Sequence, residues 1–390
     1  MDRKVLIVAS TASMIKQFNM RNIGILAQLN YRIYVAANFK NPGTITREIA
    51  NKLKEQLIDM GVVIVQVNFQ RGIGDLRSNI RCFQVLRQVM SENSFEFIHV
   101  HTALAGVIAR VAGVFQHQKI LYTIHGMQFV KGGSLFRWLM FFPVEFALSF
   151  VTNTIITINE EDSRIVNRYF NNVESVEVPG VGINFSRFDK ILDKKQALEK
   201  YGYGEQDVIL LSIGELSARK NHMAIISALK EFNNKNIKYL VVGIGALQDE
   251  IEEYIQRNNM TDQVKLLGYC ESKDLVELIG SSDYGVFPST LEGLMTAGLE
   301  VMAAGIPLIF SDVRGIRDYS EHNITGYNIG NADRKSILQS LEWAVNTKNT
   351  DSYNNMSKRC RSVAQKYDKS VVDSLMTEVY ERSSSNKLKE

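Results

Sequence analysis

Short apolar runs alternate with amphipathic segments through the first half of the chain. The apolar runs are of strand length and are bounded by polar or glycine-containing turns, and they predict strands at Val5–Ala9, Ile33–Ala37, Val62–Val67, Phe97–Val100, Ile120–Ile124, Thr154–Ile158 and Val173–Val178. The segments between them carry apolar residues at helical spacing and predict helices at Met14–Leu29, Ile45–Met60, Leu76–Met90, Ala103–Val114, Leu135–Val151 and Glu160–Tyr169. Strands that alternate with helices form mainly parallel sheets with right-handed crossovers, so the pattern predicts an α/β fold.

A second series of the same kind follows a break at Pro179–Gly182. After the break comes a polar, lysine-bearing stretch that ends near Tyr203. Strands are predicted at Val208–Ile213, Tyr239–Val242, Val264–Leu267, Tyr284–Phe287 and Leu308–Phe310, and the end of the chain is predicted to be helical throughout from Lys335 to about Arg382. The chain therefore predicts two similar α/β halves joined at about residues 179–186, with a ligand site in the cleft between them.

The helix predicted at Leu135–Val151 is unusually apolar. Arg137, Pro143 and Glu145 interrupt it, and its unbroken apolar pieces are far shorter than the ~20 residues that a membrane span needs. A largely buried helix, or one that rests on a membrane surface, fits this composition better.

Composition sets the broad class. The chain has 390 residues, 45% of them apolar and 22% charged, which favours a globular protein with two domains. Its three cysteines are widely spaced and match no metal pattern, and no signal peptide precedes the first strand, so we expect reduced thiols in a cytosolic protein. The net charge of +3 divides unevenly: residues 1–183 hold 19 Lys and Arg against 13 Asp and Glu. We expect no nucleic-acid partner; the basic half is either a solvated surface or a contact for an anionic membrane or acceptor.

Two glutamates, Glu292 and Glu300, flank a predicted helix start. The strand Tyr284–Phe287 ends at Pro288, a polar loop carries Glu292, and Glu300 interrupts an apolar helical run. Unpaired N–H groups at a helix start bind anions, and carboxylates accept hydrogen bonds from hydroxyls. The segment could therefore hold a phosphate with a polyol on either side, as in a nucleotide-sugar; the alternative is a pair of solvated surface residues.

Two further loops of the second half carry candidate chemistry. Arg219 and Lys220 follow the strand Val208–Ile213 and could neutralise a diphosphate, although a surface pair of cations is the simpler interpretation. Gly243 and Gly245 form half of a dinucleotide fingerprint whose third glycine is replaced by Gln248, which argues against a nicotinamide cofactor.

Three histidines, His99, His101 and His125, lie at strand ends of the first half, where ligands approach. His125 follows its strand directly and could donate to a sugar oxygen, whereas His99 or His101 could simply pack. The sequence contains no Asp-x-Asp and no cluster with metal-ligand spacing, so we expect Lys, Arg and a helix start to handle phosphate charge without a metal.

Together these segments resemble the retaining glycosyltransferases of family 4, which have the two-domain GT-B architecture. The resemblance covers nearly the whole chain and rests on IHVHTALAGVIARVAG (98–113), YTIHG (122–126), TIITINEED (154–162), VPGVGIN (178–184), SIGELSARKNH (212–222), VVGIGALQDEI (241–251), VKLLGY (264–269) and FPSTLEGLMTAGLEVMAAGIPLIFSDVRG (287–315). It implies two Rossmann-like domains facing a central cleft: an acceptor-binding domain at 1–183, a nucleotide-sugar-binding domain at 184–365, and a C-terminal helix and tail at 366–390 that cross back to the N-terminal domain.

The resemblance also implies roles for individual residues. Glu292 matches the glutamate that contacts donor-sugar hydroxyls, Glu300 the one that holds the ribose, Lys220 the phosphate-binding lysine and His125 the histidine near the transferring sugar. It implies further donor contacts at Arg219, Gly214, Gly243, Tyr269 and the segment of Gly293, Leu294, Met295 and Thr296, and acceptor-side contacts at Ser10, Ser13 and His101.

Two positions depart from the family pattern. Glu215 stands where many relatives carry an arginine, so either Arg219 substitutes for it or the phosphate charge is less well met. The first loop, Ser10 to Ser13, offers hydroxyls where many relatives have a glycine pair. Both departures concern donor geometry rather than the class of enzyme.

The function implied by the resemblance is transfer of a hexose, or an N-acetylated hexose, from a nucleotide-diphosphate sugar, with UDP as the first candidate nucleotide. The acceptor would be a polyprenyl-linked glycan of a bacterial capsule, exopolysaccharide or O-antigen, and the enzyme would need no cofactor or metal. We expect it in the cytoplasm, with peripheral contact to the inner face of the plasma membrane. Alternatives are a nucleotide-sugar epimerase, a glycogen-synthase-like polymerase, a non-catalytic partner protein and, least favoured, a nicotinamide dehydrogenase.

Overall fold

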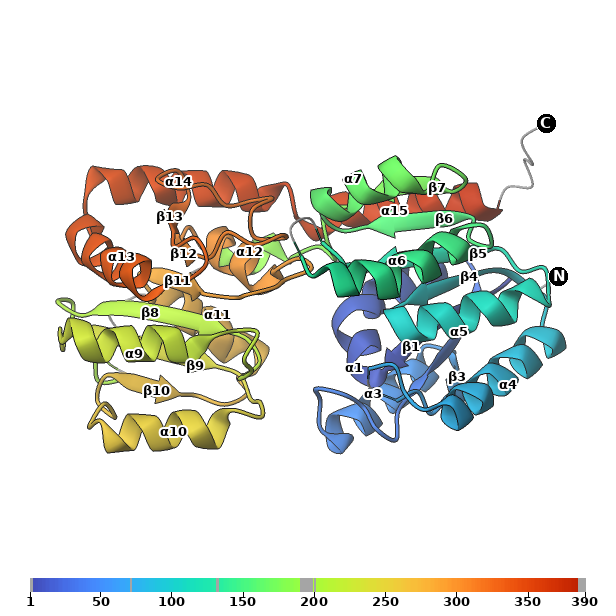
Figure 1. Ribbon diagram of the computed structural model, residues 1–390, viewed down its shortest axis with the longest axis horizontal. Helices are drawn as coiled ribbons and strands as arrows, with labels where there is room; N and C mark the ends of the chain where they lie inside the picture. The colour runs from blue at the N-terminus through green and yellow to red at the C-terminus, as the bar shows by residue number, and fades with distance from the viewer. Residues whose placement is uncertain (1–2, 71, 131–132, 190–198, 200, 385–390) are drawn as a thin grey trace. The chain divides into compact units, whose positions relative to one another are not determined.

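The computed structural model describes residues 3–384 except 71, 131–132, 190–198 and 200 (Figure 1). The chain divides into two compact units, residues 1–181 with 370–390 and residues 182–369. The boundaries expected from the sequence were 183/184 and 365/366, a few residues from these. Each unit is a separate α/β body and is described by itself.

Unit 1 contains a parallel sheet which, within the described residues, has seven strands in the order β3-β2-β1-β4-β5-β6-β7. The strands are β1 (Lys4–Thr11), β2 (Arg32–Asn38), β3 (Val63–Gln66), β4 (Phe95–His101), β5 (Ile120–Ile124), β6 (Thr154–Thr157) and β7 (Glu174–Glu177). All pairs are parallel, with β1 between β2 and β4. The sequence prediction of a parallel sheet in this half is confirmed.

Helices cover both faces of this sheet (Figure 1). One face packs against α4 (Leu76–Glu92), α5 (Ala103–Val114), α6 (Leu135–Ser149) and α7 (Glu160–Tyr169). The other face receives the last helix, α15 (Lys369–Ser384), whose Tyr380 stacks on Phe97 of β4. Side chains alternate along a strand, so Ile98 and Val100 enter the core beneath α4 and α5 while Phe97 and His99 meet α15. The chain thus returns at its end to complete unit 1.

Unit 2 repeats the architecture with a parallel sheet of six described strands in the order β10-β9-β8-β11-β12-β13. Its strands are β8 (Val208–Ile213), β9 (Ile237–Val242), β10 (Val264–Leu266), β11 (Tyr284–Phe287), β12 (Leu308–Phe310) and β13 (Gly326–Asn328). One apolar cluster joins the sheet to α9 (His222–Phe232), α10 (Gln248–Arg257) and α13 (Arg334–Thr347), and a second joins it to α11 (Ser272–Ser281), α12 (Thr296–Ala303) and α14 (Asp351–Gln365). The second α/β series is therefore also confirmed.

The structure corrects three predictions for individual elements. The segment from Lys335 to Arg382 is not continuously helical, because it breaks after Thr347 and after Gln365. Asn349 has φ +62° at the first break, and the Thr350 side chain caps the next helix. Strand β13 was not predicted, since its three residues are too short for a periodic signal.

The third correction concerns Met14–Leu29, predicted as one helix. It consists of α1 (Ala12–Met14), a π-helical turn at Ile15–Asn19 and α2 (Met20–Gln28). The Asn19 side chain is buried and donates to the Met14 carbonyl at 3.2 Å, inside this irregular turn. Insertions of this kind are frequent at functional sites, and Phe18 of this turn lines the pocket of unit 1.

Helix α6 is not the largely buried helix that was one of two expectations for it. Ser149 is its only fully buried residue, and most of its large apolar side chains are exposed. Across the described part of the chain, every helix is too short or too polar to cross a membrane.

Candidate active site

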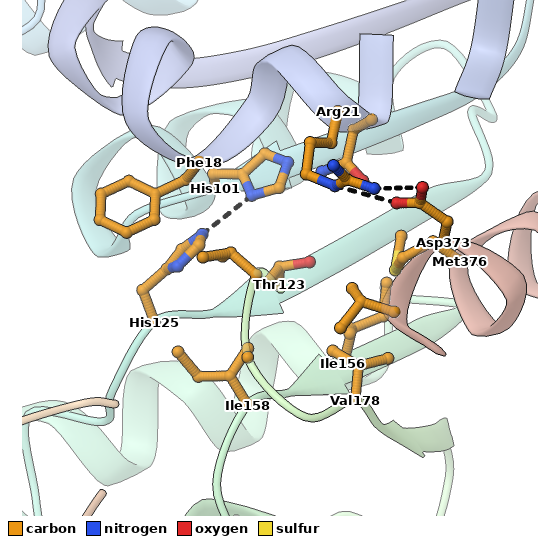
Figure 2. Close-up of a pocket in the computed structure, with 14 residues that line it drawn as sticks. Phe18, Arg21, His101, Thr123, His125, Ile156, Ile158, Val178, Asp373 and Met376 are labelled. Carbon is orange, nitrogen blue, oxygen red and sulfur yellow. Dashed lines mark hydrogen bonds and ion pairs between the residues drawn. The ribbon is translucent and has the colours of Figure 1, made fainter. Parts of the chain in front are cut away.

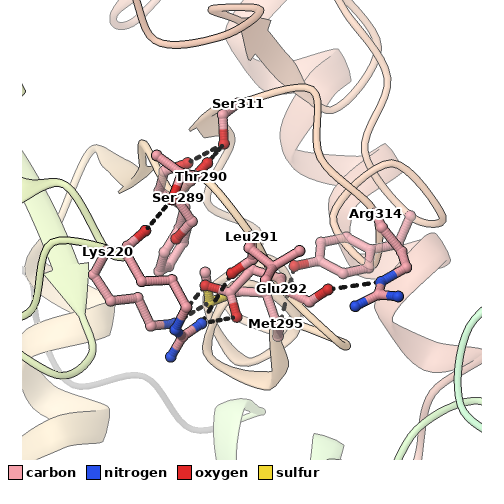
Figure 3. Close-up of polar contacts among 11 residues, drawn as sticks. Lys220, Ser289, Thr290, Leu291, Glu292, Met295, Ser311 and Arg314 are labelled. Carbon is pink, nitrogen blue, oxygen red and sulfur yellow. Dashed lines mark hydrogen bonds and ion pairs between the residues drawn. The ribbon is translucent and has the colours of Figure 1, made fainter. Parts of the chain in front are cut away.

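The loop between β11 and α12 positions Glu292 in unit 2. Strand β11 ends at Phe287, and Glu292 lies four residues before α12 starts at Thr296, as the sequence predicted. Two contacts fix the loop from outside it: the Arg314 guanidinium donates to the Glu292 carbonyl at 2.9 Å, and the Tyr319 hydroxyl donates to the Met295 carbonyl at 2.8 Å (Figure 3). The loop is therefore held at its middle, Glu292, and at its end, Met295, by buried side chains that follow β12.

Gly315 allows the closest approach to this loop. It has φ +78°, and a Cβ atom at this position would lie 2.2 Å from the Gly293 carbonyl oxygen. Only glycine combines that backbone conformation with that contact. Residues 313–315, which follow β12, thus shape the loop that carries Glu292.

Glu292 joins the two cations that follow β8. Its carboxylate lies 2.8 Å from the Lys220 ammonium and 2.8 Å from the Arg219 guanidinium (Figure 3). Glu292 and Lys220 are buried, whereas the Arg219 side chain is 40% exposed. Burial lowers the pKa of Lys220, and the negative charge of Glu292 opposes that shift. The simpler interpretation as a surface pair fits the partly exposed Arg219 but not the buried Lys220.

Backbone contacts bring the two loops together. The Thr290 amide donates to the Arg219 carbonyl at 2.9 Å, and the Asn221 amide side chain donates to the Pro288 carbonyl at 3.3 Å. Asn221, directly after Lys220, has the left-handed conformation with φ +55°, which turns the chain into α9. The loops after β8 and β11 consequently behave as one polar surface at the carboxyl edge of the sheet, where open α/β sheets bind ligands.

Glu300 lies inside α12 and is separate from the Glu292 cluster. Its carboxylate lies 3.7 Å from the Arg187 guanidinium. Burial raises the pKa of Glu300, and the positive charge of Arg187 acts against that shift. A carboxylate held in this way is suited to accept hydrogen bonds from a pair of hydroxyls.

The other donor-side residues lie around these loops. Gly214 directly follows β8 and lies beside Gly243: a Cβ on Gly243 would lie 1.9 Å from the Gly214 carbonyl oxygen, so the two turns touch through their backbones. Tyr269 is 61% exposed and directly follows Gly268, whose carbonyl accepts from the Gly243 amide at 2.8 Å. The Gly293–Thr296 segment leads directly into α12.

In unit 1, His101 and His125 form a hydrogen-bonded pair. His101 Nδ1 lies 3.0 Å from His125 Nε2, and the second ring nitrogen of each has no hydrogen-bond partner among the described residues (Figure 2). Burial lowers the pKa of His125 to about 4 and that of His101 well below the ordinary value, so both rings are neutral at pH 7. A pair of neutral imidazoles offers one free donor and one free acceptor, which suits a hydroxyl group.

This pair lines a pocket formed entirely by unit 1. Phe18 packs against His125 with a ring separation of 5.2 Å, and an ion pair between Arg21 and Asp373 of α15 borders the pocket (Figure 2). His99 takes a different role: its ring bridges the Thr123 hydroxyl at 2.7 Å and the Tyr380 hydroxyl at 2.9 Å. His99 is thus the histidine that packs, as the sequence allowed.

The acceptor-side serines do not form the loop that was expected. Strand β1 runs through Ser10 to Thr11, and Ser13 already belongs to α1, so the turn is confined to the junction of strand and helix. The Ser13 amide donates to the Pro42 carbonyl at 2.9 Å, and its hydroxyl lies 2.9 Å from that of Thr11. Ser13 is buried, and Ser10 is partly buried.

Sequence comparisons match both halves of the chain. The family described as Glycosyltransferase Family 4 matches residues 25–187, and the family described as Glycosyl transferases group 1 matches residues 193–363. The chain is a glycosyltransferase of the GT4 type. The two matches together span most of the sequence, and the enzyme is a glycosyltransferase.

Two curated relatives of this glycosyltransferase illustrate the similarity. The glycosyltransferase EpsD of Bacillus subtilis is 29% identical over 350 residues, which cover 88% of this chain and 87% of EpsD. An Escherichia coli enzyme named UDP-Gal:α-D-GlcNAc-diphosphoundecaprenol α-1,3-galactosyltransferase is 25% identical over 303 residues, covering 74% of this chain and 75% of the relative.

Solved structures confirm the GT-B fold. HepE of Anabaena, crystallised with UDP and glucose, superposes with a TM-score of 0.77 at 16% identity and covers 97% of this chain and 100% of HepE. WaaG, a glycosyltransferase of lipopolysaccharide biosynthesis, has a TM-score of 0.71 at 16% identity, with 96% of this chain and 99% of WaaG covered. Both units of this glycosyltransferase are accordingly Rossmann-like domains of the GT-B type.

Sequence reasoning missed several residues of the glycosyltransferase site. Arg314 and Tyr319 hold the Glu292 loop, and Arg187 meets Glu300, although they lie far from those residues in sequence. Arg314 is buried although it lies in the charged segment SDVRGIRD (311–318) after β12, so its sequence context gave no signal of this role. The pairing of His101 with His125 had no sequence signal beyond their strand-end positions.

Proposed function

We propose that this protein is a retaining, metal-independent glycosyltransferase of bacterial surface polysaccharide synthesis. It would move a sugar from a UDP-sugar to a lipid-linked glycan. The observation that carries the proposal is the buried Glu292 carboxylate, paired with Lys220 and Arg219 directly before the start of α12. Relatives named for capsular polysaccharide, amylovoran and diphosphoundecaprenol-linked glycan synthesis support the pathway class.

The donor diphosphate is assigned to the cations of unit 2. Lys220 supplies a buried point charge and Arg219 a forked set of donors, and the positive end of the α12 dipole adds a third source of positive potential. Without a donor, Glu292 compensates both cations. Phosphate oxygens would compete for those contacts and free Glu292 to accept hydrogen bonds from the donor sugar, while Glu300 accepts them from the ribose.

The chemical step then needs little covalent participation from the protein. The bond between the anomeric carbon and the phosphate oxygen breaks, and the acceptor oxygen bonds to the same face of the sugar. The leaving diphosphate takes up the proton of the acceptor hydroxyl. Lys220, Arg219 and the helix start stabilise the negative charge that develops on the leaving group, and neutral His125 donates to or accepts from a sugar hydroxyl.

The acceptor assignment rests on similarity to a relative that is named for its acceptor. The E. coli relative is named for a diphosphoundecaprenol-linked substrate. We assign a polyprenyl-linked glycan to this enzyme by that similarity, and we expect it to work at the surface of a membrane from the cytoplasmic side. Ser10, Ser13 and His101 remain the proposed acceptor-side residues.

The test begins with thermal unfolding of the purified protein in EDTA against UDP, GDP and ADP. A ligand that binds only the folded state raises the melting temperature with concentration, so we expect a shift with UDP and smaller shifts with the other nucleotides. UDP-sugars that raise the melting temperature of the protein are then incubated with a polyprenyl-diphosphate-linked acceptor. The anomeric configuration of the product is determined by NMR.

One added sugar with the donor's anomeric configuration, formed in EDTA, supports every part of the proposal. An inverted product rejects retention, and activity that returns only with Mg²⁺ or Mn²⁺ rejects metal independence. An epimerised donor or a long polymer identifies one of the alternative enzymes. Nucleotide binding without transfer or hydrolysis across a wide acceptor panel identifies a non-catalytic partner.

A further inference from the structure

Helix α6 presents a continuous apolar face to solvent. Leu135, Phe136, Leu139 and Phe150, the last at the helix C-cap, are 73%, 66%, 69% and 64% exposed. Large apolar side chains at this exposure are individually ordinary, but a contiguous group of them marks an interaction site. Met140, Val144 and Phe146 extend the same face.

The outward face of α6 carries no charge over most of its width. At 100° per residue, the exposed side chains from Leu135 to Phe150 cover about half of the helix circumference. Arg137 and Glu145 are the charged residues of this helix. Glu145 turns inward and lies 2.8 Å from the fully buried Arg110 of α5, and Arg137 lies at the border of the apolar arc.

The opposite face anchors α6 firmly to unit 1. Trp138 packs on Phe129 with rings 4.8 Å apart, and its indole donates to the Val130 carbonyl at 2.9 Å. Phe142 contacts Phe170 and, on α7, Tyr169. The exposed face therefore belongs to a well-packed helix whose buried side is already satisfied.

The helix layer that contains α6 carries a group of basic residues on α4, whereas α7, which packs against α6, begins with Glu160 and Glu161. That layer contains α5 and then α4, whose outward face carries Arg77, Arg81 and Arg87 together with exposed Leu76 and Ile80 (Figure 1). Residues 1–183 as a whole hold an excess of 6 positive charges. An apolar helical face with arginines two helices away in the same layer is complementary to a bilayer that contains anionic lipids.

The position of α6 in the fold links this surface to the pocket of unit 1. In a parallel α/β unit, each crossover helix begins at the carboxyl edge of the sheet. The loop from β5 to α6 starts with His125, so α6 begins at the edge where His101 and His125 lie. A bilayer under α6 would present lipid head groups near that edge.

We propose that α6 docks this protein onto a bilayer of anionic lipids, lying parallel to the surface with Leu135, Phe136, Leu139 and Phe150 in the interface and the arginines of α4 over the head groups. The identity of the occupant rests on the proposed function, because a polyprenyl-linked acceptor resides in such a bilayer. The helix lies on the membrane and does not cross it, in agreement with its length.

The experiment is sedimentation with vesicles of phosphatidylglycerol and phosphatidylcholine, compared with phosphatidylcholine alone, at low and high salt. We expect the wild type to bind the anionic vesicles at low salt. The variant Phe136→Ser/Leu139→Ser/Phe150→Ser should bind at least tenfold more weakly. Replacement of exposed Ile58 on α3 (Arg47–Asp59) by Ser is the matched control and should bind like the wild type. Arg77→Gln/Arg81→Gln should weaken binding at low salt and reduce its salt dependence.

Failure of docking and failure of the proposed function give different results. The docking proposal is overturned if the wild type does not bind anionic vesicles or if the triple variant binds them equally well. This holds even where transfer to a water-soluble acceptor analogue proceeds. Vesicle binding that depends on the α6 residues supports docking even if no transfer is found. A wild type that dimerises in solution, with a triple variant that is monomeric and equally vesicle-bound, would assign the face to a second copy of the chain instead. Equal melting temperatures of the variants show that folding is preserved.

Discussion

Glu292 holds a buried carboxylate between two cations in a site that the proposal assigns to an anionic ligand. Such an ion pair contributes little net stability, because desolvation of the charges offsets their attraction. The ion pair matters because phosphate oxygens can replace the carboxylate as the partner of Lys220. Until then, the carboxylate keeps Lys220 charged and in place. At the residue scale, the site is pre-arranged for a donor that carries its own negative charge.

Replacement of Glu292 by Gln tests this exchange. We expect turnover in the transfer assay to fall at least tenfold, which is about 1.4 kcal/mol of transition-state stabilisation, because the amide is a weaker acceptor for the sugar hydroxyls. The affinity for UDP should not weaken, since the cations lose a competitor. Exposed Glu205→Gln is the control. Unchanged turnover would remove Glu292 from the site.

The buried histidines predict how stability depends on pH. Burial lowers the pKa of His99 to about 3, and it also depresses the pKa of His101, whereas an unfolded histidine titrates near 6.5. Below that value the unfolded state binds more protons than the folded state, so stability falls as the pH drops from about 6.5 toward 4. At pH 5.5 each histidine that stays neutral in the fold accounts for a loss of about 1.4 kcal/mol.

Urea unfolding at pH 7.5 and pH 5.5 checks this prediction. His101→Gln keeps a polar group beside His125 and removes one such titration. The variant should therefore lose less stability than the wild type between the two pH values. Equal losses would mean that His101 is protonated in the folded protein, in conflict with its burial.

At the scale of elements, the Glu292 loop is shaped by a segment that follows a different strand. Gly315, Arg314 and Tyr319 all come after β12, yet they determine where the residues between β11 and α12 lie. Adjacent parallel strands bring such loops to one edge of the sheet. The donor site therefore depends on the packing of two loops rather than on one motif.

Gly315→Ala tests this dependence, and Gly330→Ala is the matched control variant. Both glycines have positive φ, but an added Cβ at Gly315 meets the Gly293 carbonyl at 2.2 Å, whereas nothing lies within 4 Å of one at Gly330. Both variants should lose about 1 kcal/mol from backbone strain. Only Gly315→Ala should also shift the loop and weaken UDP binding, measured by calorimetry, at least severalfold. Equal UDP affinity in the two variants would contradict the loop-packing explanation.

At the scale of the whole molecule, the last helix belongs to the first unit. Tyr380 of α15 is fully buried, stacks on Phe97 and lies 2.9 Å from His99 Nδ1. The ion pair of Asp373 with Arg21 adds a second link on the same helix. Unit 1 consequently combines residues before 182 with residues after 369, and its stability depends on the packing of α15.

Tyr380→Phe should lower the stability of unit 1 by about 1–3 kcal/mol, because the His99 ring loses a buried hydrogen-bond partner. Differential scanning calorimetry is the measurement, and the transition of unit 2 should not move. Tyr269→Phe, at an exposed position of unit 2, is the control. A shift in both transitions, or in neither, would contradict the assignment of α15 to unit 1.

The sequence by itself determined the order and type of most elements. Strands such as Ile120–Ile124 and helices such as Ala103–Val114 have the bounds that their apolar periodicity predicted, because that periodicity is local and both faces of a parallel sheet are buried. It also placed Glu292 before α12 and Glu300 within it, since strand ends and helix starts have local signals. The sequence did not predict the short strand β13 or the breaks within the final helical segment, because features of about three residues carry too little periodic pattern.

Only the tertiary structure decided which side chains meet. The pairing of Glu292 with Lys220 and Arg219 joins loops after two strands that are adjacent in the sheet but distant in the chain. The pairing of His101 with His125, and the use of His99 as a support for α15, depended on which face each strand turned inward. The apolar stretch at α6 fitted either burial or exposure until packing fixed one face with Trp138 and Phe142 and left the other outside. Local patterns specify elements, whereas contacts between elements depend on sheet order and helix rotation, which the complete fold sets.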